Sequence, residues 1–114
     1  MKKTFMLKKN YEFKKVLTKG KYFSGEFLDV FVIKNHKNYN LLGLAISVKS
    51  AKAVKRNKIK RFIRESYRNI EDCVNTGNSI VFLWNKKKDV NIVNYKEIRA
   101  DIENIFNKAE IMMR

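Results

Sequence analysis

The sequence predicts an α+β domain in which helices pack on one sheet. Segments with the periodicity of a helix alternate with segments rich in β-forming residues, in the order helix, two or three strands, basic helix, strand, helix. The 114 residues contain no proline and no low-complexity linker, and 45% are apolar, which is enough for a core. We therefore predict one domain over residues 1–114, with helices packed on a central antiparallel sheet.

The first 34 residues predict a short helix and a strand. Residues 1–9 are basic and expected to be irregular. Asn10 is expected to cap a helix that reaches Lys19 and ends at Gly20. Residues 22–34 are rich in β-forming side chains. Alternation along this strand places Leu28, Val30 and Val32 on one face, and Phe27, Asp29, Phe31 and Ile33 on the other.

A polar loop over residues 35–40 then leads into a second strand. That strand covers residues 41–48 and is expected to pair antiparallel with the first through the loop. His36, the only histidine, lies in this loop without a cysteine or acidic residue nearby. We interpret it as an ordinary loop residue rather than a metal ligand.

The last third of the chain predicts a turn, a buried strand and a helix. Residues 75–78 read Asn-Thr-Gly-Asn, the clearest turn signal in the sequence. The continuous apolar run 79–84 is typical of a strand that is buried on both faces. Residues 94–108 have helical periodicity, and their apolar stripe consists of Ile98, Ile102, Ile105 and Phe106.

A basic helix is predicted over residues 51–70, which contain no glycine or proline. At about 100° per residue, its apolar side chains gather on one side and its cations roughly opposite. The apolar side holds Ile59, Phe62, Ile63, Ser66 and Ile70, and the polar side holds Asn57, Lys60, Arg61, Arg64 and Arg68.

The choice of cation in this helix indicates a phosphate partner. The chain has 20 Lys and 6 Arg, and four of those arginines lie within the helix, at positions 56, 61, 64 and 68. Guanidinium binds phosphate through two parallel hydrogen bonds, whereas ammonium acts as a point charge. Most charge runs are simply solvated helix faces, but such faces mix signs, and Glu65 is the only acid between Lys49 and Arg68. We therefore favour polyanion binding.

The charge of the whole chain supports the same interpretation. The net charge is +15, and residues 1–68 supply all of it, with 19 Lys and Arg against 4 Asp and Glu. Nucleic acid is the first candidate partner and an anionic membrane surface a distant second. Cys73 is the only cysteine, so no intrachain disulfide can form. Together with the lack of a signal peptide or an apolar run of membrane-spanning length, this predicts a cytoplasmic protein.

Residues that could form a protein active site are not grouped in the sequence. The basic part of the chain holds only Glu12, Glu26, Asp29 and Glu65, and no two of them are spaced as a metal site. There is also no glycine-rich phosphate loop, no Ser/His/Asp set and no Cys/His zinc spacing. We expect no catalytic residue and no protein-held metal, so a partner would supply any reactive groups.

Residues 53–65 resemble the signature of the bacterial ribonuclease P protein subunit. They read Ala-Val-Lys-Arg-Asn-Lys-Ile-Lys-Arg-Phe-Ile-Arg-Glu, and the family pattern is Arg-Asn-x-x-Lys-Arg-x-x-Arg on a helix. Supporting matches are Leu7-Lys-Lys followed by Phe13, Val16 and Gly20, and the run 42–47. The resemblance implies an α-β-β-β-α-β-α sandwich with a central four-stranded sheet. It also implies a left-handed βαβ crossover that carries the basic helix, against the usual hand.

The resemblance also implies a function and two binding surfaces. The subunit binds a catalytic RNA and the 5′ leader of precursor tRNA, and assists Mg²⁺-dependent removal of the leader, with Mg²⁺ held mainly by the RNA. Neither DNA nor a membrane is implied as a partner. Phe13, Leu17 and Phe31 match a leader-binding cleft, although without the resemblance plain core packing would be favoured for the two phenylalanines. The predicted RNA-binding residues are Lys49, Lys52, Arg56, Asn57, Lys60, Arg61, Arg64 and, from helix geometry alone, Arg68.

Two other functions fit the charge pattern alone. A structural RNA-binding protein, such as a small ribosomal protein, would co-purify with ribosomal subunits. A DNA-binding module would lay the basic helix in the major groove and prefer duplex DNA to folded RNA.

Overall fold

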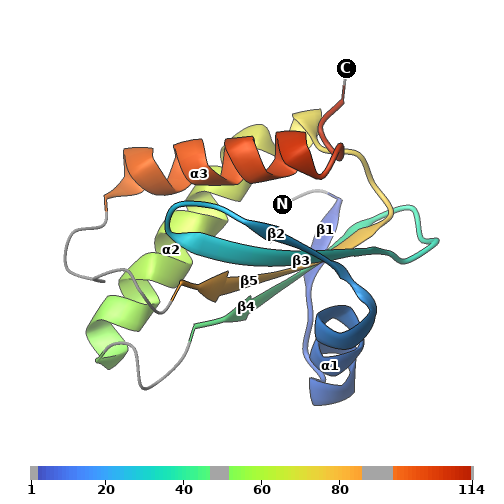
Figure 1. Cartoon of the computed structure of the whole chain (residues 1–114), viewed down its shortest axis with the longest axis horizontal. Helices are drawn as coiled ribbons and strands as arrows, with labels where there is room; N and C mark the ends of the chain where they lie inside the picture. The colour runs from blue at the N-terminus through green and yellow to red at the C-terminus, as the bar shows by residue number, and fades with distance from the viewer. Residues whose placement is uncertain (1–2, 47–51, 86–93, 114) are drawn as a thin grey trace.

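The fold was analysed in a computed structural model of the chain, which describes residues 3–46, 52–85 and 94–113. Figure 1 shows one sheet with helices on both faces. The helices of the described parts are all too short or too polar to cross a membrane. The elements are β1 (Thr4–Met6), α1 (Asn10–Lys19), β2 (Lys21–Ser24), β3 (Leu28–Lys34), β4 (Asn40–Ala45), α2 (Ala53–Ile70), the 3-10 turn η2 (Glu71–Cys73), β5 (Asn78–Trp84) and α3 (Tyr95–Lys108).

The centre of the sheet is β5, the last strand in chain order. The strand order is β1-β4-β5-β3-β2, with β5 antiparallel to β3 and parallel to β4. The predicted antiparallel pairing of the two strands around the 35–40 loop is therefore wrong, because β5 lies between them. Almost every residue of β5 is buried, so the strand needs neighbours on both edges and cover on both faces.

The described residues form five strands, one more than the four that the resemblance implies. Thr4–Met6 was expected to be irregular, but it pairs parallel with β4, with Phe5 opposite Leu41. The predicted strand 22–34 is in fact two strands, β2 and β3, joined by a tight hairpin.

The β2–β3 hairpin is fixed by a carboxylate from α3. The backbone N–H groups of Glu26, Phe27 and Leu28 donate to the Asp101 carboxylate at 2.7, 3.0 and 2.9 Å. A Cβ at Gly25 would lie 2.3 Å from Asp101 Oδ1, so only glycine lets the turn approach this closely. The contact joins residues that are far apart in sequence.

The two faces of the sheet have different cover. Figure 1 shows α2 and α3 on one face and α1 on the other. Leu28, Val30 and Val32 contribute to the core under α2 and α3, which confirms the predicted alternation. Phe31 and Ile33 lie under α1, also as predicted. Phe27 belongs to the α2/α3 core instead, so its predicted face was wrong, because it precedes the regular strand.

The connection β4-α2-β5 is a crossover between parallel strands. In Figure 1 both strands run to the left, α2 lies above them and β5 is the nearer strand, so the crossover is left-handed, as the resemblance implies. The α+β fold is therefore confirmed, but the predicted antiparallel sheet is wrong, because β4 pairs parallel with both β1 and β5.

The three helices were predicted well, apart from one cap. The stripe of α3 is fully buried, and the Asn94 side chain caps this helix by accepting from the N–H of Glu97 at 2.9 Å. The helix α1 has the predicted bounds, but Asn10 is its first residue and not its cap. Lys9 takes the cap position, and its N–H donates to the Glu12 carboxylate at 3.3 Å. His36 is an exposed loop residue, as expected.

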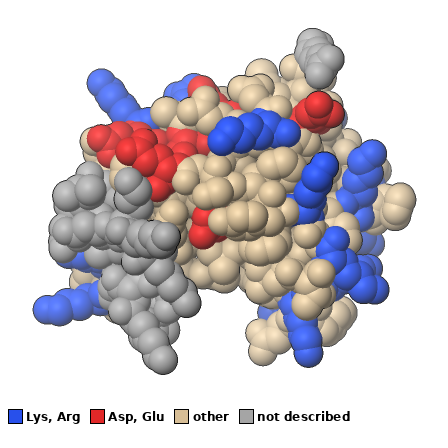
Figure 2. All heavy atoms as spheres, viewed as in Figure 1, with Lys and Arg blue, Asp and Glu red and all other residues tan. Residues whose placement is uncertain are grey.

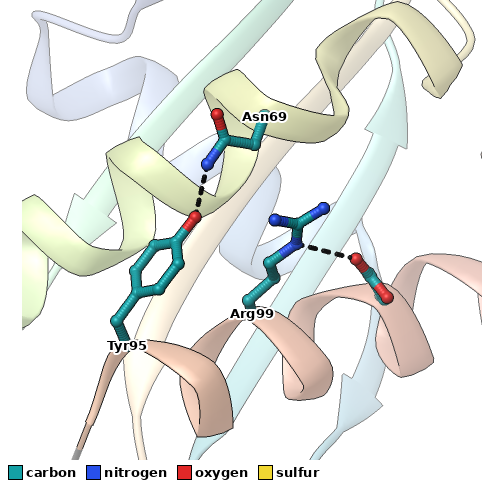
Figure 3. Close-up of polar contacts among 4 residues, drawn as sticks. Asn69, Tyr95 and Arg99 are labelled. Carbon is teal, nitrogen blue, oxygen red and sulfur yellow. Dashed lines mark hydrogen bonds and ion pairs between the residues drawn. The ribbon is translucent and has the colours of Figure 1, made fainter.

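Contacts between side chains hold α2 against α3. The Phe62 and Tyr95 rings meet edge to face with their centroids 6.1 Å apart, and the Tyr95 hydroxyl is hydrogen-bonded to Asn69 (Figure 3). On the exposed side of α3, Arg99 and Glu103 form an ion pair at 3.1 Å. The two contacts of Tyr95, with Phe62 and with Asn69, help to hold α2 in its orientation against α3.

Candidate nucleic-acid interface

One side of α2 is anchored in the core. Ile59, Ile63 and Ile70 are buried, and the ring of Tyr67 is buried against Phe106, with centroids 6.2 Å apart. Ser66 is buried too, whereas Phe62 is only partly buried. The predicted apolar side is confirmed, and Tyr67, which the sequence analysis did not single out, belongs to it.

The opposite side of α2 faces outward. Asn57, Arg61 and Arg68 are exposed there, and Lys60 and Arg64 are partly exposed. Arg56 is also partly exposed, but it lies off this side, because it precedes buried Ile59 by three residues. Exposed Lys52 is the N-cap residue of the helix, so its side chain lies beside the first turn. Lys49 lies outside the described residues. The geometry therefore brings seven of the eight predicted RNA-binding residues onto or next to one helix.

A shallow hollow of about 510 Å³ lies on the outward side of α2. It is lined by Val54, Asn57, Lys58, Arg61 and Arg64. The cations of Lys58 and Arg61 lie 5.7 and 5.6 Å from the centroid of the Phe62 ring, which favours fixed positions for both. The hollow thus combines flat guanidinium donors, an ammonium and a side-chain amide, a set suited to phosphate oxygens.

The position of α2 leaves its first turns accessible. In Figure 1 the helix begins beyond the ends of β4 and β5 and then runs back over the sheet. The first turn holds no acidic residue, so the positive end of the helix dipole adds to the charge of the side chains. The end of the helix that projects is therefore its more electropositive end.

The three predicted cleft residues meet on the other face of the sheet. Phe13 and Leu17 of α1 and Phe31 of β3 are all partly buried, around the buried side chains of Leu7, Val16 and Val81. A Cβ at Gly43 would lie 2.5 Å from the Phe13 ring, so α1 approaches β4 closely where a glycine permits it. These residues form a partly exposed apolar patch, which is the surface required for base stacking.

Two residues of β2 complete this patch, and sequence reasoning missed both. The exposed ring of Tyr22 lies 5.2 Å from that of Phe31, and its hydroxyl donates to Asp29 at 2.9 Å. The Ser24 hydroxyl also donates to the Asp29 carboxylate, at 3.2 Å. The signal lay in the strand register, because Tyr22 pairs with Phe31 and Ser24 with Asp29. The acid beside the aromatic patch is thus held by two hydroxyl groups.

Metal-ligating side chains do not cluster in the described parts of the chain. No group of three His, Cys, Asp or Glu residues there is arranged to hold a metal ion. Cys73 is exposed.

Comparisons with known proteins agree with the fold and with the signature helix. A family model described as Ribonuclease P matches residues 1–110. The ribonuclease P protein component of Clostridium kluyveri is 39% identical over 105 residues, covering 92% of this chain and 94% of the relative. That of Clostridium botulinum is 40% identical over 106 residues, with coverage of 92% and 94%.

Solved structures show the same similarity. The RNase P protein of Staphylococcus aureus superposes with a TM-score of 0.83 at 25% identity, covering 94% of this chain and 96% of that one. The RNase P protein from Thermotoga maritima gives a TM-score of 0.82 at 28% identity, with coverage of 91% and 96%.

Proposed function

This chain belongs to the ribonuclease P protein family, the protein component of a ribonucleoprotein endonuclease, and from that premise we propose which contacts it makes. It binds the catalytic RNA through the outward side of α2, and the 5′ leader of precursor tRNA through the patch under α1. The bond cleavage is performed by the RNA, in the cytoplasm. The observation that carries the proposal is the division of α2 into a buried apolar side and an outward side with Arg61, Arg64 and Arg68.

The outward side of α2 would act by neutralising phosphate charge. Each phosphate that an arginine or lysine contacts releases condensed counterions, which favours binding and makes it depend on salt. Two RNA segments repel each other near a cleavage site, and cations between them lower that repulsion. Arg61 and Arg64 border the same hollow and are one turn apart, so both can contact one strand.

The patch under α1 would hold the unpaired leader. Phe13 and Phe31 offer ring surface to bases, and Tyr22 extends that surface to the sheet edge. Base stacking on an aromatic side chain is worth about 1–3 kcal/mol per base and depends little on sequence. Such a patch suits leaders whose sequences differ from one tRNA to another.

Mg²⁺, which the family implies, does not fit the outward side of α2. Mg²⁺ prefers oxygen ligands, above all carboxylates, and α2 offers Glu65 as its single acid among six lysines and arginines in the signature run. We therefore assign Mg²⁺ to the RNA, and no protein residue in this proposal acts as its ligand.

The test is stimulation of precursor-tRNA cleavage. The chain is mixed with a bacterial ribonuclease P RNA at low Mg²⁺, and the rate of leader removal is measured against RNA alone. We expect clear stimulation by the wild-type chain and much less by Arg61→Ala/Arg64→Ala. Lys96→Ala, which removes an exposed cation from α3, should retain most of the effect. Failure of the wild-type chain to stimulate cleavage would contradict the proposal, and co-purification with ribosomal subunits would favour the structural RNA-binding alternative.

A further inference from the structure

A second basic hollow lies at the other end of the sheet from the start of α2. Its volume is about 720 Å³, and it opens where the C-terminal end of α3 meets the β3–β4 loop and the turn at 75–78. Four lysines line it, from β2, β3, the loop and α3: Lys21, Lys34, Lys37 and Lys108. In Figure 2 basic side chains gather at the right of the molecule, where this end of the sheet lies, whereas acidic ones gather over the first half of α3.

The strand register brings the first two lysines together. Lys21 pairs with Val32 across the β2–β3 ladder, and Lys34 follows two residues after Val32, on the same face. Phe23 and Val32 share that face and pack on the α2/α3 core. The hollow therefore lies on the face of the sheet opposite to α1, away from the Phe13–Phe31 patch.

Two hydrogen bonds hold the rim of the hollow, one between its two loops and one within the β3–β4 loop. The N–H of Asn35 donates to the carbonyl of Gly77 at 2.9 Å, and the Asn35 side chain accepts from the N–H of Lys37 at 2.8 Å. Gly77 has a φ of 92° and approaches the carbonyl of Lys37 closely enough that a Cβ would lie 3.1 Å from it. Lys34 and Lys37 thus extend from a backbone that is already fixed.

The floor of the hollow is apolar. It includes partly buried Phe23, buried Val32 and Ile111, and Ala109, while Asn75 and Thr76 add amide and hydroxyl groups at the side. Among the described residues that line the hollow, Glu110 is the only acid. A cationic rim over an aromatic floor matches one nucleotide, with its phosphate at the lysines and its base over Phe23.

We infer that this hollow binds a nucleotide unit of an RNA strand and is a third RNA contact, separate from α2 and from the patch under α1. The inference rests on the proposed function in taking RNA as the partner. None of the four lysines belongs to either of the other surfaces. Lys21 and Lys34 share β2 and β3 with Tyr22 and Phe31 but lie on the opposite face of the sheet. The RNA would therefore contact the protein at both ends of the sheet.

The test uses NMR spectra of the isolated full-length chain, titrated with a single-stranded RNA of four nucleotides. We expect saturable shifts of the amide signals of residues 34–37 and 75–78, read separately from those of α2. Lys34→Gln and Lys37→Gln should each weaken this binding several-fold and lower the slope of log affinity against log salt by about one. Lys96→Gln removes one charge from the first half of α3 and should leave the slope unchanged.

Three outcomes would overturn the inference. The first is an absence of shifts at 34–37 and 75–78, and the second is equal weakening by Lys34→Gln and Lys96→Gln. The third is binding of inorganic phosphate in the hollow as tightly as the oligonucleotide, which would make it a free-phosphate site. Stimulation of precursor-tRNA cleavage is measured separately. Stimulation of cleavage without shifts at the hollow would overturn only this inference. Shifts at the hollow without stimulation of cleavage would overturn only the proposed function.

Discussion

A single carboxylate, that of Asp101, satisfies three backbone N–H groups of the β2–β3 hairpin. The side chain is buried, with 5% of its surface exposed, and its two oxygens accept from Glu26, Phe27 and Leu28. Buried donors without acceptors are costly, so α3 and the hairpin depend on one another.

Replacement of Asp101 by asparagine is expected to destabilise the fold. The amide keeps one oxygen and turns an NH₂ group toward backbone donors, so at least one hairpin N–H loses its acceptor. We expect the free energy of unfolding to fall by about 2–3 kcal/mol. Urea unfolding followed by circular dichroism measures the change, with Glu97→Gln on the exposed first turn of α3 as the control. A loss equal to that of the control would contradict this account.

The buried hydroxyl of Tyr67 connects α2 to β1 and β4. It lies 2.7 Å from Thr4 Oγ1 and accepts from Asn40 Nδ2 at 3.0 Å. Burial, the largest cause, raises the pKa of Tyr67 above its ordinary value of 10.0. The folded chain therefore retains this proton more tightly than the unfolded chain. The resulting contribution to the free energy of unfolding is fully present below pH 10.0 and is lost as the pH rises through the higher pKa of the folded chain.

Alkaline unfolding tests the role of Tyr67. At neutral pH, Tyr67→Phe should lower the free energy of unfolding by about 1–2 kcal/mol, because Thr4 and Asn40 lose a partner. Above pH 10, however, the free energy of unfolding of the Tyr67→Phe variant should fall less steeply with pH than that of the wild-type chain. Tyr11→Phe, at a position 67% exposed, should keep the wild-type steepness. Identical pH profiles for both variants would rule out a contribution from the Tyr67 proton.

At the scale of the element, α2 separates the residues that stabilise the fold from those that we propose bind RNA. Its apolar side packs in the core with α3 and the sheet, whereas Arg61 and Arg68 on its cationic side are exposed. A substitution on one side should therefore change one property and leave the other nearly unchanged.

Single substitutions on the two sides of α2 test this separation. Ile63→Ala should lower the free energy of unfolding by about 2–5 kcal/mol, because Ile63 is fully buried. Arg61→Ala and Arg64→Ala should change stability by about 0.5 kcal/mol or less. Each arginine variant should weaken binding to ribonuclease P RNA and lower its salt slope by about one. Thermal melts and filter binding at several salt concentrations provide both readouts, and equal destabilisation by all three variants would contradict the two-sided helix.

Local patterns predicted the elements of this protein better than their caps. The bounds of α1, α2 and α3 followed from periodicity, and the buried character of β5 from its continuous apolar run. The strand β1 was missed because three residues carry too little periodicity. The cap of α1 was misplaced by one residue because Asn10 is a better capping residue than Lys9, and the interaction of Glu12 with the N–H of Lys9 outweighs that preference.

At the scale of the whole molecule, long-range pairing and composite sites were not predictable from the sequence. Nothing in residues 28–45 indicates that residues 78–84 will be inserted between the two strands. The contact of Asp101 with the hairpin and the hollow beside Lys34 likewise combine distant segments. The cationic side of α2 could be predicted because one helix carries it. The aromatic patch needed the family resemblance, because its phenylalanines also fit ordinary packing.

The late position of β5 has a consequence for how the chain is made. During translation β3 and β4 leave the ribosome before β5. Neither strand can pair with β5 until residue 84 has left the exit tunnel. Sheets that depend on such distant pairings form slowly. The arginine-rich segment 53–70 therefore emerges before it has a core to pack on, and the cationic side of α2 takes its final orientation only after β5 has emerged.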